Sequence, residues 1–160
     1  MNLQLNWNKA TGKPVTGNDT ANLSFVLTNG LRGSDKYTDS EWAGWYDKDA
    51  SFIIDLGKNE PIHKVILGCF TNYGMGVHIP SSIKMYISDD NQCFTLIGEN
   101  KHSFNEIFKE GIYQTDEVFN NLSAFGRYLK LEMKNPGKCP ENHTVPGRGT
   151  WMYFDEIIVE

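Results

Sequence analysis

Apolar and polar residues alternate with a period of two in several short segments of this chain. In Ser51–Gly57 the side chains of Phe52, Ile54 and Leu56 share one face, because successive side chains of a strand point to opposite faces. Arg127–Met133 repeats this alternation. Each segment therefore predicts a β-strand that lays one face on a core.

Further strands are predicted between and after these two. Lys64–Phe70 is apolar on both faces, as expected for a strand inside a sandwich. Ile83–Ser88 alternates and then meets a polar turn, where Asn91 tolerates the left-handed conformation, so the chain should return through Cys93–Ile97 as a hairpin. Trp151–Glu160 is predicted to close the chain as a last strand.

Helical periodicity is nearly absent. Asn18–Val26 predicts a single helical turn with Asp19 or Thr20 as its cap, while Phe104–Phe119 alternates only weakly. Short strands at regular intervals without helices between them favour an all-β fold, an antiparallel sandwich or jelly roll of about eight strands. The length of 160 residues suits one domain, 1–160, with one core.

Charge and composition argue against several classes of partner. The net charge is −5 and the pI is near 5.4, whereas nucleic acids and anionic membranes reward dense Lys and Arg clusters. No apolar run is long enough to span a bilayer, and the first residues lack the charged and apolar regions of a signal peptide. The sequence thus predicts either a cytosolic protein or a piece of a longer chain.

The cysteines predict neither a disulfide framework nor a zinc site. Cys69, Cys93 and Cys139 are odd in number and share no C-x-x-C spacing. At most one disulfide bridge could form among them.

Catalytic motifs are missing from the sequence. It contains no G-x-S-x-G, P-loop or H-E-x-x-H pattern. Asp47 with Asp49, or Glu141 with His143, could be imagined as an acid and a base acting on a glycosidic bond. Because acidic residues are common in turns, we predict that this chain is not an enzyme.

Two loops combine aromatic and polar residues, as loops that carry function often do. Leu27–Ala50 mixes aromatic rings with aspartates, and Thr71–His78 contains two glycines. Sugars present C–H faces that stack on aromatic rings, and hydroxyls that need fixed hydrogen-bond partners. The predicted carbohydrate-binding residues are Trp45, Tyr46, Tyr73, His78, His143 and Arg148. Trp42 and Trp151 are predicted core residues. In the alternative to a binding role for the first loop, one tryptophan fills the core and the acids only solvate turns.

The order of several motifs resembles the discoidin, or coagulation factor V/VIII type C, domain over nearly the whole chain. The motifs are LTNG, W followed three residues later by GW, FIIDLG, HKVILG, IPSSIKMYISDD, RYLKLEM and W-x-x-F-D-E-I-I-V. The sugar-binding branch of that family is carbohydrate-binding module family thirty-two. The segments P-E-N-H and P-G-R-G-T-W look most like versions appended to bacterial β-N-acetylhexosaminidases of the chitobiase type.

The resemblance implies a galactose-binding-domain-like jelly roll that serves a larger exported glycoside hydrolase. The implied partners are a glycan containing galactose or N-acetylhexosamine and the catalytic domain of the parent protein, in a periplasmic, cell-surface or secreted location. The His, Arg and Asn pattern of galactose-binding members does not align residue by residue, which leaves the sugar open. The alternative is a structural or interaction module that packs on the catalytic domain without binding sugar. Tyr73 and Met75 fit a discoidin-type membrane binder poorly.

The resemblance also implies a structural calcium ion where the L-T-N-G turn meets an acid of the last strand. The matching positions are Leu27, Asn29, Ser34 and Glu156. Alternation places Glu156 on the face of Phe154 and Ile158, where a buried carboxylate needs a partner. Asn29 stands where the family usually has Asp, so sodium or an empty site is an alternative. In a further alternative, Glu156 reaches solvent or accepts hydrogen bonds from the turn amides.

Overall fold

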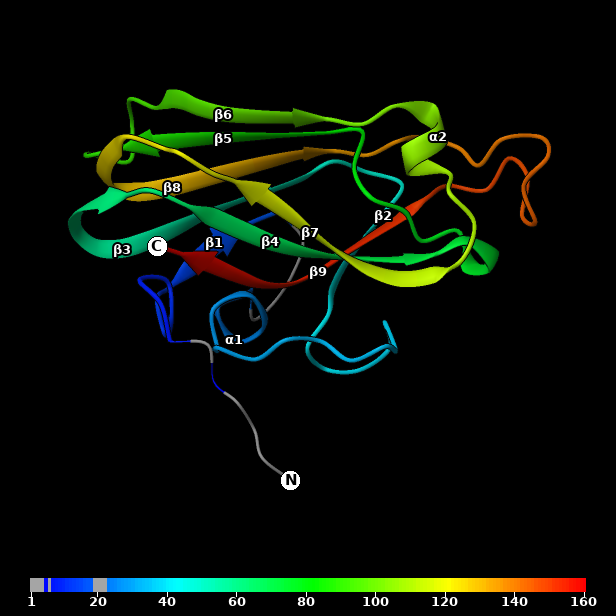
Figure 1. Ribbon diagram of the computed structural model, residues 1–160, viewed down its shortest axis with the longest axis horizontal. Coiled ribbons are helices and arrows are strands. Elements are labelled where there is room, and N and C mark those ends of the chain that lie inside the picture. Colours follow the sequence, from blue (N-terminus) through cyan, green and yellow to red (C-terminus); the bar gives the residue numbers. More distant parts are fainter. Residues whose placement is uncertain (1–4, 6, 19–22) are drawn as a thin grey trace.

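The computed structural model describes residues 5, 7–18 and 23–160, and two antiparallel sheets packed face to face make up most of it (Figure 1). The strands are β1 (Val15–Gly17), β2 (Ala43–Tyr46), β3 (Ala50–Ile62), β4 (Val65–Asn72), β5 (Ser82–Ser88), β6 (Thr95–Lys101), β7 (Ile112–Phe119), β8 (Ala124–Lys134) and β9 (Trp151–Val159). One sheet has the order β1-β3-β8-β5-β6 and the other β2-β9-β4-β7. The predicted antiparallel β-sandwich is confirmed.

The helical segments are short. They are α1 (Leu23–Leu27), the 3₁₀ turn η1 (Tyr73–Met75) and α2 (Phe104–Ile107). The single helical turn predicted near Asn18–Val26 is confirmed by α1, whereas its predicted caps, Asp19 and Thr20, lie outside the described residues. Among the described residues no helix is long and apolar enough to cross a membrane.

The predicted alternation is confirmed in the main core. Phe52, Ile54 and Leu56 of β3 are at most 1% exposed and pack in one cluster with the inward residues of β8. Asn91 has a φ of 60°, as predicted for the turn of the β5–β6 hairpin. The returning strand β6 begins at Thr95, slightly later than predicted. The strand β2 was not predicted, because a four-residue segment containing Ala and Gly lacks a β pattern.

A second, smaller cluster lies outside the four-stranded sheet. Trp42, Phe70 and Val77 form its buried part, and partly buried aromatic residues pack against it. The Trp42 indole N–H donates to the Ser34 carbonyl at 3.0 Å, which fastens the loop before β2. Trp42 is therefore buried as predicted, but outside the main core.

β9 carries a β-bulge at Asp155 and Glu156, beside a shift in its register with β4. The bulge resets the alternation. Phe154 and Ile157 are both fully buried, whereas Ile158 is only partly buried. Glu156 therefore shares a face with Ile158 but not with Phe154, so the prediction that it shares a face with both is wrong for Phe154.

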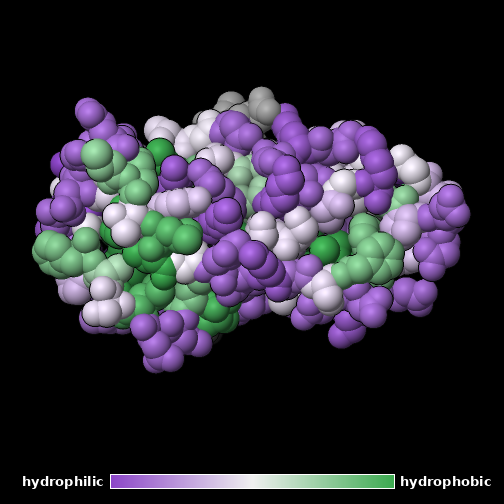
Figure 2. All heavy atoms as spheres, turned by 90° about the horizontal axis from the view of Figure 1, so that it is seen from above, coloured by the Kyte–Doolittle hydropathy of each residue, from purple (hydrophilic) through white to green (hydrophobic). Residues whose placement is uncertain are grey.

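Large apolar side chains that reach the surface are dispersed. Trp7, Phe104, Ile112 and Phe125 are each more than half exposed. Figure 2 shows hydrophobic residues in separate groups divided by hydrophilic ones on the face that it views. All of Cys69, Cys93 and Cys139 are free thiols.

Candidate functional site

The segments that carry the predicted binding residues meet at the end of the sandwich that lies away from the C-terminus (Figure 1). This end is formed by the β2–β3 turn, η1, α2 and the long loop 135–150 that leads into β9. Its backbone is held by hydrogen bonds between these segments: Asp47 N–H donates to Thr150 O at 2.9 Å, and Trp151 N–H donates to Gly76 O at 2.9 Å. The loops therefore present a connected surface.

Trp45 is not part of that surface. Its side chain has no exposed area, and its ring packs 5.6 Å from Phe154 and 6.1 Å from Phe52 between ring centroids. Its indole N–H is satisfied by the Asn18 carbonyl at 2.8 Å. The prediction that Trp45 contacts a sugar is wrong, because alternation along β2 turns Trp45 into the core.

The same alternation turns Tyr46 outward. Tyr46 is 40% exposed, and its ring centroid lies 4.9 Å from that of Trp151. Trp151 stacks in turn on Tyr153 at 5.4 Å. Trp151 and Tyr153 are half-buried, so the prediction of Trp151 as a core residue is wrong. The outward positions of β9 alternate with buried Met152 and Phe154, a period-two signal that could have placed Trp151 on the outer face.

Charged groups adjoin this aromatic run. Asp47 forms an ion pair with Lys138 at 2.5 Å, and its hydrogen bond raises the pKa of Lys138. Gly149 lies against Asp47, since a Cβ on this glycine would come 2.6 Å from the Asp47 carboxyl carbon. Arg148 is exposed, and its carbonyl accepts from the Cys139 amide at 2.8 Å. Cationic and anionic hydrogen-bonding groups thus lie next to Tyr46 in the chain and in space.

The two predicted histidines are buried behind Tyr73. His78 is 1% exposed and His143 is 5% exposed. The prediction that either histidine contacts a sugar is therefore wrong. Tyr73 is half-buried and its ring lies 4.0 Å from the His143 ring. The Nε2 atoms of the two histidines are 3.0 Å apart. Burial lowers the pKa of His78 to about 4, and the neighbouring His143 contributes in the same direction.

The two aspartates imagined as an acid and a base have other partners. Asp47 is paired with Lys138, and Asp49 is paired with Lys134 at 3.0 Å. Asp49 also accepts from the Asn135 amide at 2.9 Å. Glu141 is exposed while His143 is buried. The side chains of Asp47 and Asp49 are thus engaged in fastening loops.

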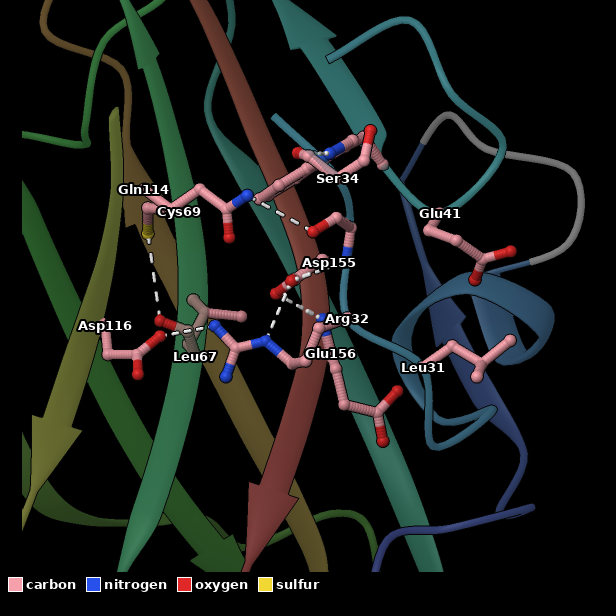
Figure 3. A network of polar contacts seen from close by, with 12 residues as sticks. Leu31, Arg32, Ser34, Glu41, Leu67, Cys69, Gln114, Asp116, Asp155 and Glu156 are labelled. Atoms are coloured by element: carbon pink, nitrogen blue, oxygen red, sulfur yellow. Dashed lines mark hydrogen bonds and ion pairs between the residues drawn. The ribbon is translucent and has the colours of Figure 1, made fainter. Parts of the chain in front are cut away.

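An ionic network that the sequence did not reveal is centred on the buried Asp155 and crosses the outside of β9 (Figure 3). Asp155 Oδ2 accepts from Arg32 Nε and from the Gly33 amide, both at 2.9 Å. Arg32 also contacts Asp116 of β7. Burial raises the pKa of Asp155, while the charge of Arg32 opposes this rise. The network fastens the loop before β2 to the sheet.

Glu156, the carboxylate proposed for a cation, has no exposed area. Its Oε2 accepts from the Gly30 amide at 3.1 Å, but Oε1 has no hydrogen-bond partner among the described residues. Burial raises the pKa of Glu156 to about 8, against the opposing hydrogen bonds of the Gly30 amide and the Asn8 side chain. The side-chain oxygen of Asn29 accepts from Leu31 N–H at 2.8 Å. An unsatisfied carboxylate oxygen next to a turn fits a cation ligand.

Ser34 and Leu27 fit that site less directly. The Ser34 carbonyl accepts from Trp42, and Figure 3 draws Ser34 and Glu156 on opposite sides of Asp155. The Leu27 side chain is fully buried in the main core, so only its backbone carbonyl could serve as a ligand.

Solved structures with this fold are numerous, although no family model and no curated protein matches the sequence. A fucose binding module of Streptococcus pneumoniae, SpX-3, is 13% identical with a TM-score of 0.57, over 96% of this chain and 97% of that chain. CpGH89CBM32-5 from Clostridium perfringens, solved with GalNAc-β-1,3-galactose, is 13% identical with a TM-score of 0.54, over 92% and 94%. The chain SpGH29 is 13% identical with a TM-score of 0.54, over 96% of this chain but 27% of that longer chain. The fold is that of these modules, as expected from the discoidin-type resemblance.

Proposed function

We propose that this chain is a non-catalytic glycan-binding domain that accompanies a glycoside hydrolase. The observation that carries the proposal is the exposed Tyr46 ring against Trp151, next to the Asp47–Lys138 pair, with the exposed Arg148 on the same loop as Lys138. The proposed site therefore keeps Tyr46 and Arg148 from the sequence prediction and adds Trp151. Tyr73 lies at the same end of the sandwich and is a peripheral candidate.

The chemistry of this surface suits a sugar ring. An aromatic side chain offers an apolar face for sugar C–H groups, while retaining a polar edge. A sugar hydroxyl can donate to the Asp47 carboxylate or accept from the Lys138 ammonium, and hydrogen bonds with ionised groups are stronger than bonds between neutral groups. The ion pair also holds both charged groups in place before a ligand arrives, which lowers the ordering cost of binding.

The structural neighbours support the proposal through their names. One is named a fucose binding module, and another was solved with GalNAc-β-1,3-galactose. We propose a galactose- or N-acetylhexosamine-containing glycan for this chain, with the catalytic domain of a parent chitobiase-type β-N-acetylhexosaminidase as its second partner. The match to part of the longer SpGH29 chain agrees with such a modular arrangement. An exported parent enzyme would place the domain in the periplasm, at the cell surface or outside the cell.

A glycan array probed with the purified domain tests this proposal. We expect retention on terminal galactose or N-acetylhexosamine structures, and loss of that retention in the variant Tyr46→Ala. A domain that binds none of the arrayed glycans would instead be a module that packs on its catalytic partner without binding sugar.

We also propose a structural cation, calcium in the first instance, at Glu156. The carboxylate would supply charge through its unpartnered Oε1, and backbone carbonyls of the turn at residues 27–30 would supply further oxygen ligands. A cation there would stabilise the ionised carboxylate and join the turn to β9. Protonation of Glu156 is the other way to satisfy this buried oxygen, and it fits the raised pKa.

Thermal melts with calcium and with chelator separate the two states of Glu156. A ligand that binds only the folded chain must raise the Tm, so we expect a higher Tm in millimolar calcium. The variant Glu156→Gln should lose that response. An identical Tm with calcium and with chelator, together with a Glu156→Gln variant as stable as the parent, would leave protonation as the explanation.

A further inference from the structure

Three metal-ligating side chains meet at the loop end of the sandwich although they are far apart in the sequence. The ligand atoms of His78, Cys139 and His143 all lie within 4.8 Å of one another, and all three side chains are buried. His78 lies on the segment between η1 and β5, whereas Cys139 and His143 belong to the loop 135–150. No C-x-x-C or His-x₃-His spacing marks this group, which is why the sequence pattern did not predict it.

We infer that His78, Cys139 and His143 form a binding site for zinc, with an exogenous fourth ligand. Zinc takes thiolate and imidazole ligands at about 2.3 and 2.0 Å in tetrahedral sites, and three protein ligands with one open position are a common arrangement. Such bonds place neighbouring ligand atoms about 3.3–3.7 Å apart. To admit the ion, the two Nε2 atoms must move slightly apart from 3.0 Å, and the group, whose ligand atoms lie within 4.8 Å of one another, must draw in to these spacings.

The surrounding contacts orient the first histidine for coordination. His78 Nδ1 lies 2.9 Å from the Ile107 carbonyl at the end of α2, and since a carbonyl can only accept, Nδ1 carries the proton. The lone pair of His78 is therefore on Nε2, which points toward the cluster. A backbone carbonyl that fixes the remote nitrogen is the usual second partner of a histidine ligand.

The backbone places Cys139 against the opposite segment. Cys139 and Arg148 are joined by a 2.8 Å hydrogen bond between amide and carbonyl, which closes the base of the loop. Gly76 has a φ of 71°, and a Cβ at this position would lie 3.5 Å from Cys139 Sγ. The sulfur thus packs over the glycine of the η1 segment, beside His78.

Zinc coordination changes the protonation of the Cys139 thiol and of the His143 ring. Val145 N–H donates to His143 Nδ1 at 3.1 Å, so His143 carries its proton on Nε2 and donates it to His78. When zinc binds, the Cys139 thiol releases one proton to solvent and becomes the thiolate ligand. His143 then bonds zinc through Nε2 and carries its proton on Nδ1, which gives up the hydrogen bond from the Val145 amide and donates to Thr144 Oγ1 at 3.4 Å. One proton is released for each ion bound.

Bound zinc would fasten the loop 135–150 to η1 and α2. This loop carries Arg148 and leads directly into Trp151, so zinc would hold residues beside the proposed glycan surface. Zinc binding at this buried site does not depend on glycan binding, because the cobalt band, the Tm and thiol alkylation report on it directly.

Cobalt substitution in the purified 160-residue chain tests the inference. Titration of the chelator-treated parent with Co²⁺ should give a thiolate-to-cobalt charge-transfer band that saturates at one ion per chain, and Zn²⁺ should displace it. Cys139→Ser should lose the band and the zinc-induced rise in Tm. Cys93→Ser, which removes an exposed thiol, should keep both. Absence of the band in the parent, or its loss in Cys93→Ser with retention in Cys139→Ser, would overturn the site.

Thiol alkylation of the parent covers the case in which Cys139→Ser fails to fold. With iodoacetamide and mass-spectrometric mapping under mild denaturant, zinc should slow the modification of Cys139 while Cys93 reacts at an unchanged rate. Equal rates at Cys139 with zinc and with chelator would also overturn the site.

Discussion

The Asp155 carboxylate occupies the space that a side chain on Gly68 would fill. A Cβ at Gly68 would overlap Asp155 Oδ1 and would lie 2.6 Å from an Arg32 guanidinium nitrogen. Gly68 lies in β4 beside the β9 bulge that carries Asp155. The absence of a side chain in one strand thus admits the ion pair that fastens the loop before β2.

Gly68→Ala should therefore destabilise the fold. Inserting a methyl group into a filled space typically costs about 1–3 kcal/mol, and here it also displaces the ion pair between Arg32 and the buried Asp155. Urea unfolding should show a lower midpoint. Gly74→Ala is the matched control, because the nearest atom to its added Cβ would be 3.7 Å away; equal stability of both variants would show that the space beside Asp155 is not filled.

A second prediction concerns pH and the pair His102–Glu117. His102 Nε2 lies 2.9 Å from Glu117 Oε1, and this hydrogen bond raises the pKa of His102 above its usual 6.5. The folded chain then holds a proton that the unfolded chain releases, so the contribution is complete below pH 6.5 and is lost as pH rises through the folded pKa. The free energy of unfolding, measured in urea, should fall over that range.

Glu117→Gln should make this fall shallower, whereas His63→Gln, which removes an exposed imidazole, should leave it unchanged. The burial of Glu156, with a pKa of about 8, adds a slope of the same sign. His102 is therefore assessed from the difference between the parent and Glu117→Gln in the pH dependence of the free energy of unfolding. Identical pH profiles for the parent and Glu117→Gln would refute the assignment.

A third prediction separates neighbouring residues of β2. Trp45→Ala should cost about 3–5 kcal/mol of stability, as expected for truncation of a large buried aromatic side chain, because Trp45 packs on Phe52 and Phe154. Tyr46→Ala should cost about 1 kcal/mol or less, since its ring is 40% exposed. Comparable losses in the two variants, measured by urea unfolding, would contradict the orientation of β2.

The fold was predictable where alternation was regular. Phe52, Ile54 and Leu56 follow a strict period of two, and the structure places them in the core. The alternation failed at Glu156, because the bulge in β9 inserts one residue, and a bulge has no signature in a hydrophobic pattern.

The site was less predictable, because burial of loop residues depends on what packs over them. Two glycines beside Tyr73 and His78 suggested an exposed loop, yet the loop 135–150 covers His78 and brings His143 to it. That contact joins positions 65 residues apart. Conversely, Trp151 resembled a core residue, and only its outward position on β9 places it beside Tyr46.

Calorimetric titration of the best glycan from the array into Tyr46→Ala and Phe125→Ala tests the central claim most directly. Phe125 is the matched control, because it is an exposed aromatic residue, 63% accessible, at the start of β8. Loss of a stacking contact worth about 1.4 kcal/mol corresponds to about tenfold weaker binding. We predict that loss for Tyr46→Ala and parental affinity for Phe125→Ala; parental affinity in Tyr46→Ala would contradict the assignment of the glycan site.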